Sequence, residues 1–350
     1  MKITHKGLFK GMGFNSKLFP ILSATLAEGF DHDLLESILN ECSAPLRESR
    51  MEKAILSLCK ERGLSAFQEE GCIWVNAKTK AQVKKARLVF VAHMDHPGVT
   101  IESFDGTTAK GSWQGGGPTD IEGAPVWVFN ETEELEGEII SATYGDGRPK
   151  KIEISLKSEP KNKKGSWGAC LQFPTEIRAS EIRTRSADDL VSVCACLEAL
   201  IRAGSPEGVV ILLSRSEEIH QAGVVDILKK NPLDPNAQIV VVDTTEGKAK
   251  FMGLGVVIRS GDSDIEYTES MTDWLKKKAE ESESEARVMR TSGRTDADIF
   301  LEKGFEVGSL AISVLNQHNE GASGIMPEIV STRDYSRLIQ FVSVLMRGSS

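Results

Sequence analysis

Four short apolar runs, the last of them broken only by Ser313, constrain the fold of this chain more than any other feature of its sequence. They span residues 88–91, 209–213, 239–242 and 310–315. A strand that is apolar at consecutive positions is buried on both faces, which is typical of a parallel sheet covered by helices. Because stretches with helical periodicity lie between these runs, the sequence predicts an α/β fold with a mostly parallel central sheet and helices on both faces.

The helical stretches have apolar residues at three- and four-residue spacing. Residues 33–61 predict two helices separated by Pro45, with Gly63 capping the second. Residues 190–203 and 335–346 predict two further helices. These helices supply the apolar faces that a buried sheet needs on either side.

Residues from about 101 to 173 interrupt this rhythm. Glycine clusters such as 115–117 separate short β-prone pieces such as 126–129, and no helical period appears. We therefore expect a small β-rich domain inserted into the α/β core. The expected division of the chain is 1–100 for the first part of the core, 101–175 for the insertion and 176–350 for the second part of the core.

The composition indicates a globular chain and excludes some partners. Of the 350 residues, 40% are hydrophobic and 27% are charged, which allows a large core under a solvated surface. The chain carries 42 Lys and Arg against 51 Asp and Glu, a net charge of −9. Because no dense basic stripe is present, nucleic acid is not expected as a partner.

The sequence also bears on location. No run of about 18 apolar residues is present, so no membrane-spanning helix is expected. Near the N-terminus, Lys2, Lys6 and Lys10 precede an apolar stretch at 18–27, but Pro20 makes that stretch a poor signal-peptide core. The six cysteines form neither a dense framework nor a CxxC pair, so we expect unpaired thiols and a cytoplasmic protein.

Imidazole and carboxylate side chains follow the apolar runs, where parallel strands place their reactive groups. Each of them alone is more typical of a cap or an ion pair. The set is His93 and Asp95, the pair Asp188–Asp189, the pair Glu217–Glu218, Asp243, and His318. Together they supply the nitrogen and oxygen ligands that Zn²⁺, Co²⁺ or Mn²⁺ accept.

Charge counting favours two metal ions at this edge. Two divalent ions carry four positive charges, which Asp188, Glu218, Asp243 and a bridging hydroxide would balance. Without metal, the converging carboxylates would repel one another strongly. The sequence therefore predicts a site for two divalent cations, most simply zinc, with cobalt or manganese as substitutes.

The order of these motifs resembles that of the co-catalytic metallo-aminopeptidases. The similarity is greatest to the glutamyl, deblocking or tetrahedral aminopeptidase family and covers roughly residues 33–346. The stretch 113–129, with its glycine run before a strand, and the stretch 292–297 also match. The resemblance implies a metal-dependent hydrolase that cleaves amide bonds, acting as an aminopeptidase on peptides.

The resemblance also implies a role for each site residue. Asp188 would bridge the two metals, His93 and Asp243 would complete one metal site, and Glu218 and His318 would complete the other. Asp95 would orient His93, and Glu217 would be the general base. A Glu beside a ligand can take a proton from water and return it to the departing amine.

The family places its inserted domain at the same position and builds hollow oligomers with it. The resemblance therefore implies a homo-oligomer in which residues 101–173 mediate association and roof the active site. Trp113, Val126, Trp127 and Phe129 could anchor such an interface or fill the small domain's own core.

Three positions depart from the family pattern, namely His96, Leu190 and His220. We expect them to crowd the mouth of the site and to alter substrate specificity. Two alternatives to the aminopeptidase stay open at this point. One is a carboxypeptidase or an N-acyl amidohydrolase with the same metals, in which Arg294 could bind the substrate carboxylate. The other is a non-catalytic binding relative.

Overall fold

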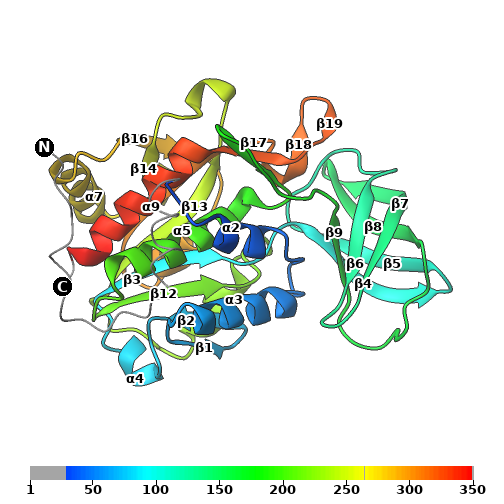
Figure 1. Cartoon of the computed structure of the whole chain (residues 1–350), viewed down its shortest axis with the longest axis horizontal. Coiled ribbons are helices and arrows are strands. Elements are labelled where there is room, and N and C mark those ends of the chain that lie inside the picture. The colour runs from blue at the N-terminus through cyan, green and yellow to red at the C-terminus, as the bar shows by residue number, and fades with distance from the viewer. Residues whose placement is uncertain (1–28, 264, 349–350) are drawn as a thin grey trace, which may run out of the picture.

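A large mixed sheet covered by helices forms the body of the protein, and a small closed β-barrel projects from it (Figure 1). The computed structural model describes residues 29–263 and 265–348. The apolar stretch at 18–27 and the lysines before it lie outside the described residues.

The predicted parallel strands lie side by side at the centre of the sheet, in the order β12, β3, β13 and β17. Their bounds are Val209–Ser214 for β12, Leu88–His93 for β3, Gln238–Glu246 for β13 and Glu306–Leu315 for β17. Each covers one of the four apolar runs, and β3 and β12 are buried along their whole length. The predicted α/β fold is thus confirmed at its centre.

Within the described residues the sheet has 12 strands, because further strands, all paired antiparallel except β16 on β14, extend it on both sides of this centre. On one side lie β2 (Cys72–Val75) and β1 (Ala66–Glu69). On the other side lie β20 (Glu328–Ser331), β11 (Glu181–Thr184), β10 (Glu176–Ile177), β14 (Val256–Asp262), β15 (Ile265–Glu266) and β16 (Ala286–Thr291). None of these strands was expected from the sequence, since their apolar runs are short or interrupted.

Helices cover both faces of the sheet. One face packs against α2 (His32–Leu39), α3 (Ser49–Glu61), α5 (Ala187–Ala203), α7 (Glu269–Glu281) and α9 (Thr332–Arg347). The other packs against α6 (Ala222–Leu228), α8 (Ala297–Glu302) and the short α4 (Lys80–Val83). The expected helices at 33–61, 190–203 and 335–346 are present, with Gly63 in the left-handed conformation after α3.

The chain leaves the core after β3 and forms a closed barrel before it returns. The strand order around the barrel is β4 (Gly98–Asp105), β5 (Thr108–Gln114), β8 (Arg148–Leu156), β7 (Glu134–Gly145), β6 (Pro125–Phe129) and β9 (Gly168–Leu171). The expected β-rich insertion is thus a barrel. The exact division of the chain at residues 100 and 175 stays a prediction.

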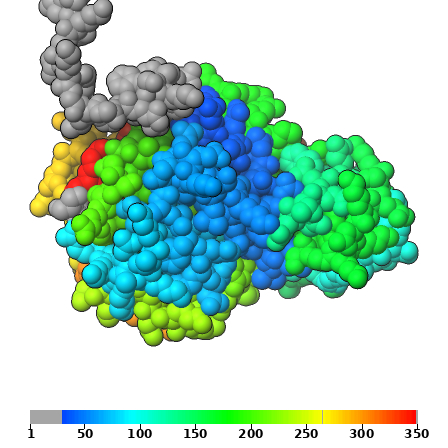
Figure 2. All heavy atoms as spheres, turned by 60° about the horizontal axis from the view of Figure 1, so that its bottom comes forward, coloured from blue at the N-terminus to red at the C-terminus, as the bar shows by residue number. Residues whose placement is uncertain are grey.

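The barrel's large apolar residues are mostly used within the protein. Trp113 and Val126 belong to the barrel's own core, and Phe129 packs beside Cys42 and Cys170 where the barrel meets the body. In Figure 2 the segment containing α2 and α3 lies against the barrel. The guanidinium of Arg47, between these helices, donates to the carbonyl oxygen of Trp167 at 2.7 Å.

Two further expectations concern membranes and thiols. No helix in the described part of the chain is long and apolar enough to cross a membrane. All six cysteines are buried and free, as expected.

Candidate metal centre

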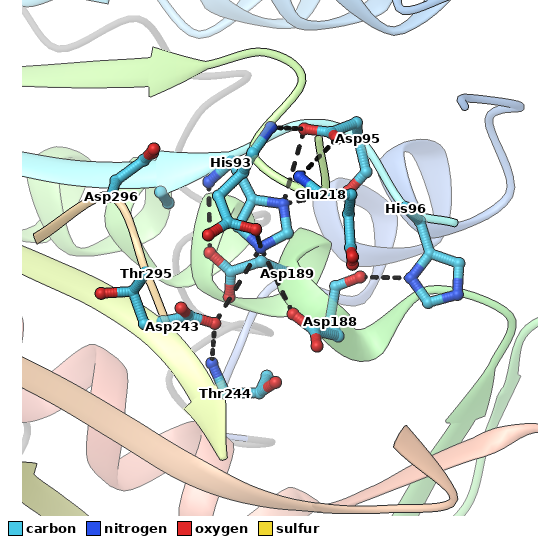
Figure 3. A network of polar contacts seen from close by, with 12 residues as sticks. His93, Asp95, His96, Asp188, Asp189, Glu218, Asp243, Thr244, Thr295 and Asp296 are labelled. Atoms are coloured by element: carbon cyan, nitrogen blue, oxygen red, sulfur yellow. Dashed lines mark hydrogen bonds and ion pairs between the residues drawn. The ribbon is translucent and has the colours of Figure 1, made fainter. Parts of the chain in front are cut away.

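The side chains that follow the central strands converge at one edge of the sheet (Figure 3). His93 ends β3, Asp243 lies on β13, and Glu217–Glu218 follow β12. The carboxyl-terminal ends of β12, β3 and β13 lie side by side because these strands are parallel neighbours in the sheet. Asp188 joins them from the start of α5, and His318 from the short 3₁₀-helix η2 (Gln317–Asn319) after β17.

The converging residues form two groups, within each of which the ligand atoms lie within 4.8 Å of one another. One group is His93, Asp189 and Asp243, all buried; the other is Asp188, Glu218 and His318, of which the last two are half-buried. The structure therefore brings together all five residues expected to bind metal. It adds Asp189, which the sequence analysis had noted only as the neighbour of Asp188.

The carboxylate of Asp188 lies between the two histidines. Its Oδ1 is 3.4 Å from Nε2 of His93, and its Oδ2 is 3.4 Å from Nε2 of His318. Nε2 of His318 is also 3.2 Å from Oε1 of Glu218. A carboxylate with one oxygen beside the histidine of each group has the arrangement expected of a ligand that bridges two metal ions.

Asp95 contacts His93 through its backbone carbonyl, whereas we expected its side-chain carboxylate to orient that histidine. Nδ1 of His93 donates to the backbone carbonyl of Asp95 at 3.1 Å, whereas the Asp95 carboxylate is 3.7 Å away. That hydrogen bond leaves Nε2 of His93 free to bind a cation. The Asp95 carboxylate instead accepts the backbone N–H groups of Glu217 at 2.9 Å and Glu218 at 3.2 Å. Asp95 thus holds the acidic pair beside His93.

Two residues that hold the ligand residues, Glu328 and Gln317, were missed from the sequence. The carboxylate of Glu328, on β20, accepts the backbone N–H of Asp188 at 2.8 Å and that of His318 at 2.7 Å. The amide of Gln317 donates to Oδ2 of Asp188 at 2.7 Å. The only sequence signal for Glu328 is an acidic residue at the start of an apolar strand.

The electrostatics of the site favour bound positive charge. Burial would lower the pKa of His93, yet its contacts with Asp188 and Asp95 hold that pKa well above its usual value. Burial raises the pKa of Asp243 to about 6, although Arg259 opposes the shift. Burial likewise raises the pKa of Glu217 well above its usual value, helped by the acidic side chains around it. In the absence of cations, this cluster of carboxylates attracts protons instead.

The donor set fits divalent metal ions. It combines imidazole nitrogens with carboxylate oxygens, as zinc sites in hydrolases do. One oxygen of Asp189, Oδ1, is buried and has no hydrogen-bond partner in the part of the chain that the structure describes. A buried carboxylate oxygen without a partner is costly unless a cation or a water satisfies it. Each group therefore offers enough ligands for one ion.

The three departures from the family pattern do not share one position. Leu190 is fully buried in the core on the α5 side of the sheet, so it does not crowd the site mouth as we expected. His96 is also buried, with Nδ1 facing the carbonyl oxygen of Asp188 at 2.5 Å and Nε2 facing Oδ1 of Asn319 at 3.1 Å. His220 is exposed.

The barrel reaches the metal centre through the glycine run after β5. A side chain on Gly116 would place its Cβ 1.9 Å from Nδ1 of His318. A Cβ on Gly115 would lie 3.1 Å from the carboxylate of Glu218. Gly116 leaves no room for a side chain beside His318, and Gly115 has a φ of 84°, which favours glycine.

This fold and this site define a class of protein, the hydrolases that use two metal ions at the edge of an α/β sheet. The particular family follows from the sequence: the chain belongs to the M42 glutamyl aminopeptidase family, whose sequence model matches residues 71–340. The expected metal-dependent aminopeptidase is thus confirmed at the level of the family. A comparison with curated proteins found no match.

Solved structures share the whole fold. A TET aminopeptidase from a marine sediment Thaumarchaeota archaeon is 15% identical, with a TM-score of 0.75 over 90% of this chain and 96% of that one. The TET1 peptidase of Pyrococcus horikoshii is 18% identical, with a TM-score of 0.73 over 89% and 98%. An aminopeptidase from Desulfurococcus kamchatkensis is 18% identical, with a TM-score of 0.73 over 90% and 94%. At these identities the similarity establishes the fold alone.

Proposed function

We propose that the chain removes N-terminal residues from peptides with two divalent cations, most simply zinc, held by the two groups around Asp188. The observation that carries this proposal is the position of Asp188, with one carboxylate oxygen 3.4 Å from each histidine Nε2. His93 and Asp243 would complete one ion's ligands, with Asp189 beside them, and Glu218 and His318 would complete the other's.

Held by these residues, two divalent cations would supply the chemistry of the reaction, namely the activation of a water molecule and the polarisation of the scissile carbonyl. The chain's own part is proton transfer and positioning. The carboxylate of Glu217 would take a proton from the attacking water as the new C–O bond forms. It would then return that proton to the amine nitrogen as the C–N bond breaks. Asp95 holds the backbone of Glu217 in place for this task.

The carboxypeptidase alternative depended on Arg294 as the partner of a substrate carboxylate. Nε of Arg294 is 2.7 Å from Oδ2 of Asp298, one helical turn further on, so this guanidinium already has an acidic partner. With the family assignment, this pairing favours the aminopeptidase.

A substrate panel tests the activity. Purified protein, stripped of metal and reconstituted with Zn²⁺, Co²⁺ or Mn²⁺, is assayed on peptides with a free amine, the same peptides N-acetylated, and N-acyl amino acids. We expect cleavage of the free-amine peptides alone, from the N-terminus. Release of C-terminal residues would point to a carboxypeptidase, and cleavage of the acylated compounds to a deacylase.

We also propose that the protein is a cytoplasmic homo-oligomer that associates through its barrel. The Pyrococcus horikoshii TET1 peptidase is described as assembling into a tetrahedron or a large octahedral shell. The exposed barrel residues Ile140 and Tyr144, on β7, offer apolar contact area for such an association. Light scattering at micromolar concentration should give a mass several times 38.2 kDa. A monomer would contradict this part of the proposal.

A further inference from the structure

The turn that carries Glu217 is a tight loop between β12 and α6. The backbone N–H groups of Gln221, Ala222 and Gly223 donate in turn to the carbonyl oxygens of Glu217, Ser216 and Arg215, at 2.9, 3.0 and 3.1 Å. Gln221 itself has a φ of 52°, in the left-handed region that side chains other than glycine rarely adopt. A glutamine at a position that suits glycine suggests that its side chain is needed there.

The Gln221 side chain does have a specific partner. Its amide nitrogen, Nε2, lies 3.1 Å from Oε1 of Glu217, and both side chains are buried. Because a carboxylate accepts and does not donate, the amide N–H is the donor. Gln221 therefore contacts Glu217 twice, through its backbone N–H and through its side chain.

The contacts of Glu217 divide between its backbone and its carboxylate. Asp95 accepts the Glu217 backbone N–H but does not restrain the end of the side chain. Within the described residues, Gln221 is the hydrogen-bond donor to the Glu217 carboxylate, through Oε1. The other oxygen, Oε2, lies 4.0 Å from Nε2 of His93, on the side of the metal centre.

We infer that Gln221 is a positioning residue for Glu217. Its amide holds Oε1, so that Oε2 faces the space between the two groups of ligands. Gln221 acts through Glu217 and, within the described residues, forms no hydrogen bond to a ligand of the proposed metal ions. This inference rests on the proposed function, in which Glu217 is the general base.

The test is a double-mutant cycle on the metal-loaded protein with a free-amine peptide. Gln221→Met keeps the length of the side chain and removes the donor. A hydrogen bond to a charged group is worth a factor of roughly 10–100, so we expect kcat to fall by about that factor. KM and metal content should stay at the wild-type values. In the Glu217→Gln background, Gln221→Met should cause no further loss, because its partner has already lost its function.

Two other variants make the test robust. Gln238→Met removes a second glutamine–glutamate contact, to Glu306 at 3.5 Å on the surface, and should leave kcat unchanged. Gln221→Gly suits the left-handed backbone, so it should fold even if Gln221→Met does not, and it should show the same loss of kcat.

The outcomes distinguish a wrong role for Gln221 from a wrong role for Glu217. If Glu217→Gln lowers kcat but Gln221→Met and Gln221→Gly do not, the role of Gln221 is wrong while the proposed function stands. Equal losses from the Gln221 change in the wild-type and Glu217→Gln backgrounds would indicate a general structural effect and overturn the inference. If Glu217→Gln turns over at the wild-type rate, the general-base assignment fails, and the inference about Gln221 fails with it.

Discussion

The two halves of the metal centre are built from different parts of the molecule. The half containing His93, Asp189 and Asp243 is fully buried and comes from two central strands and the start of α5. The half containing Asp188, Glu218 and His318 is partly exposed at Glu218 and His318. Glu218 lies in the turn after β12 and His318 in η2 after β17, and the barrel glycines lie against them.

This difference in burial suggests different roles for the two halves. The buried half is surrounded by core packing, so its geometry depends on the sheet itself. The other half, called the exposed half below, is only half-buried at Glu218 and His318, and its surroundings include a segment of the barrel. We therefore expect the substrate to approach from the side of Glu218 and His318, and the ion at that half to exchange more readily.

The largest effect is expected from replacing Asp188, the residue that contacts a histidine of each half. Asp188→Ala should lose both ions and with them the activity, because Asp188 lies 3.4 Å from a histidine of each half. Elemental analysis after gel filtration measures the loss. One full equivalent of metal retained in this variant would show that Asp188 does not bridge. Asp120→Ala, at an exposed carboxylate of the barrel, is the control.

The next largest effect separates chemistry from metal binding within the acidic pair. Glu217→Gln should keep its metal and lose a factor of about 10²–10⁴ in kcat, the usual contribution of general acid–base catalysis. The matched variant Glu218→Gln should instead weaken metal retention at the exposed half, because Glu218 contacts His318. Steady-state kinetics and metal analysis on the two variants check both statements. Equal kinetics for Glu217→Gln and the wild type would exclude the assigned role.

The sequence predicted the residues that converge at the site, Asp189 excepted, better than the contacts that surround them. His93 and Asp243 could be found because each follows an apolar run of a central strand, and parallel neighbours bring such positions together. The antiparallel flanks were missed because a strand such as β20, of four residues, has too short a pattern to distinguish from a loop.

The contacts that hold the ligands were the hardest to predict. Glu328 accepts the backbone N–H of Asp188, 140 positions earlier in the chain, and no local pattern encodes a contact over that separation. The task of the Asp95 carboxylate was missed for a similar reason, since its partners at 217 and 218 lie on another strand's turn. Such contacts depend on the packed fold, whereas strand ends follow from local periodicity.

A smaller effect is expected from a change that lowers the metal affinity of one half alone. Gly116→Ala places a Cβ against the ring of His318, so the ring or the barrel loop has to move. Displacing a ligand in this way should weaken metal binding at the exposed half by about 10- to 100-fold, the usual cost of disturbing a ligand's surroundings. Binding at the buried half should be unchanged. A competition titration with a chelator resolves the two affinities.

The control for this variant is the neighbouring glycine. Gly117→Ala brings its Cβ against Trp113, within the barrel, and not against a metal ligand. It should disturb the barrel without changing either affinity. Two equally weakened sites in Gly116→Ala would mean that the halves are not independent.

The smallest effect is on the free energy of unfolding of the metal-free protein, through a buried carboxyl group beside the site. Glu48, before α3, is buried and accepts the hydroxyl of Ser216 at 2.7 Å, next to Glu217. Burial, with help from the charge on Asp95, raises the pKa of Glu48 from 4.5 to about 7. A carboxyl whose pKa is raised by folding stabilises the folded state below its unfolded pKa. That contribution is lost as the pH rises through the folded pKa.

The metal-free wild type should therefore lose about 2 kcal/mol of stability through Glu48 between pH 5 and pH 8, at roughly 1.4 kcal/mol per pKa unit. Glu48→Gln cannot ionise, so its free energy of unfolding should fall less over this range. Urea denaturation of both proteins at the two pH values measures the difference. Parallel pH dependences would mean that the Glu48 carboxyl is not held neutral. Because Glu48 interacts with Asp95, binding metal beside Asp95 should reduce the difference between the two proteins.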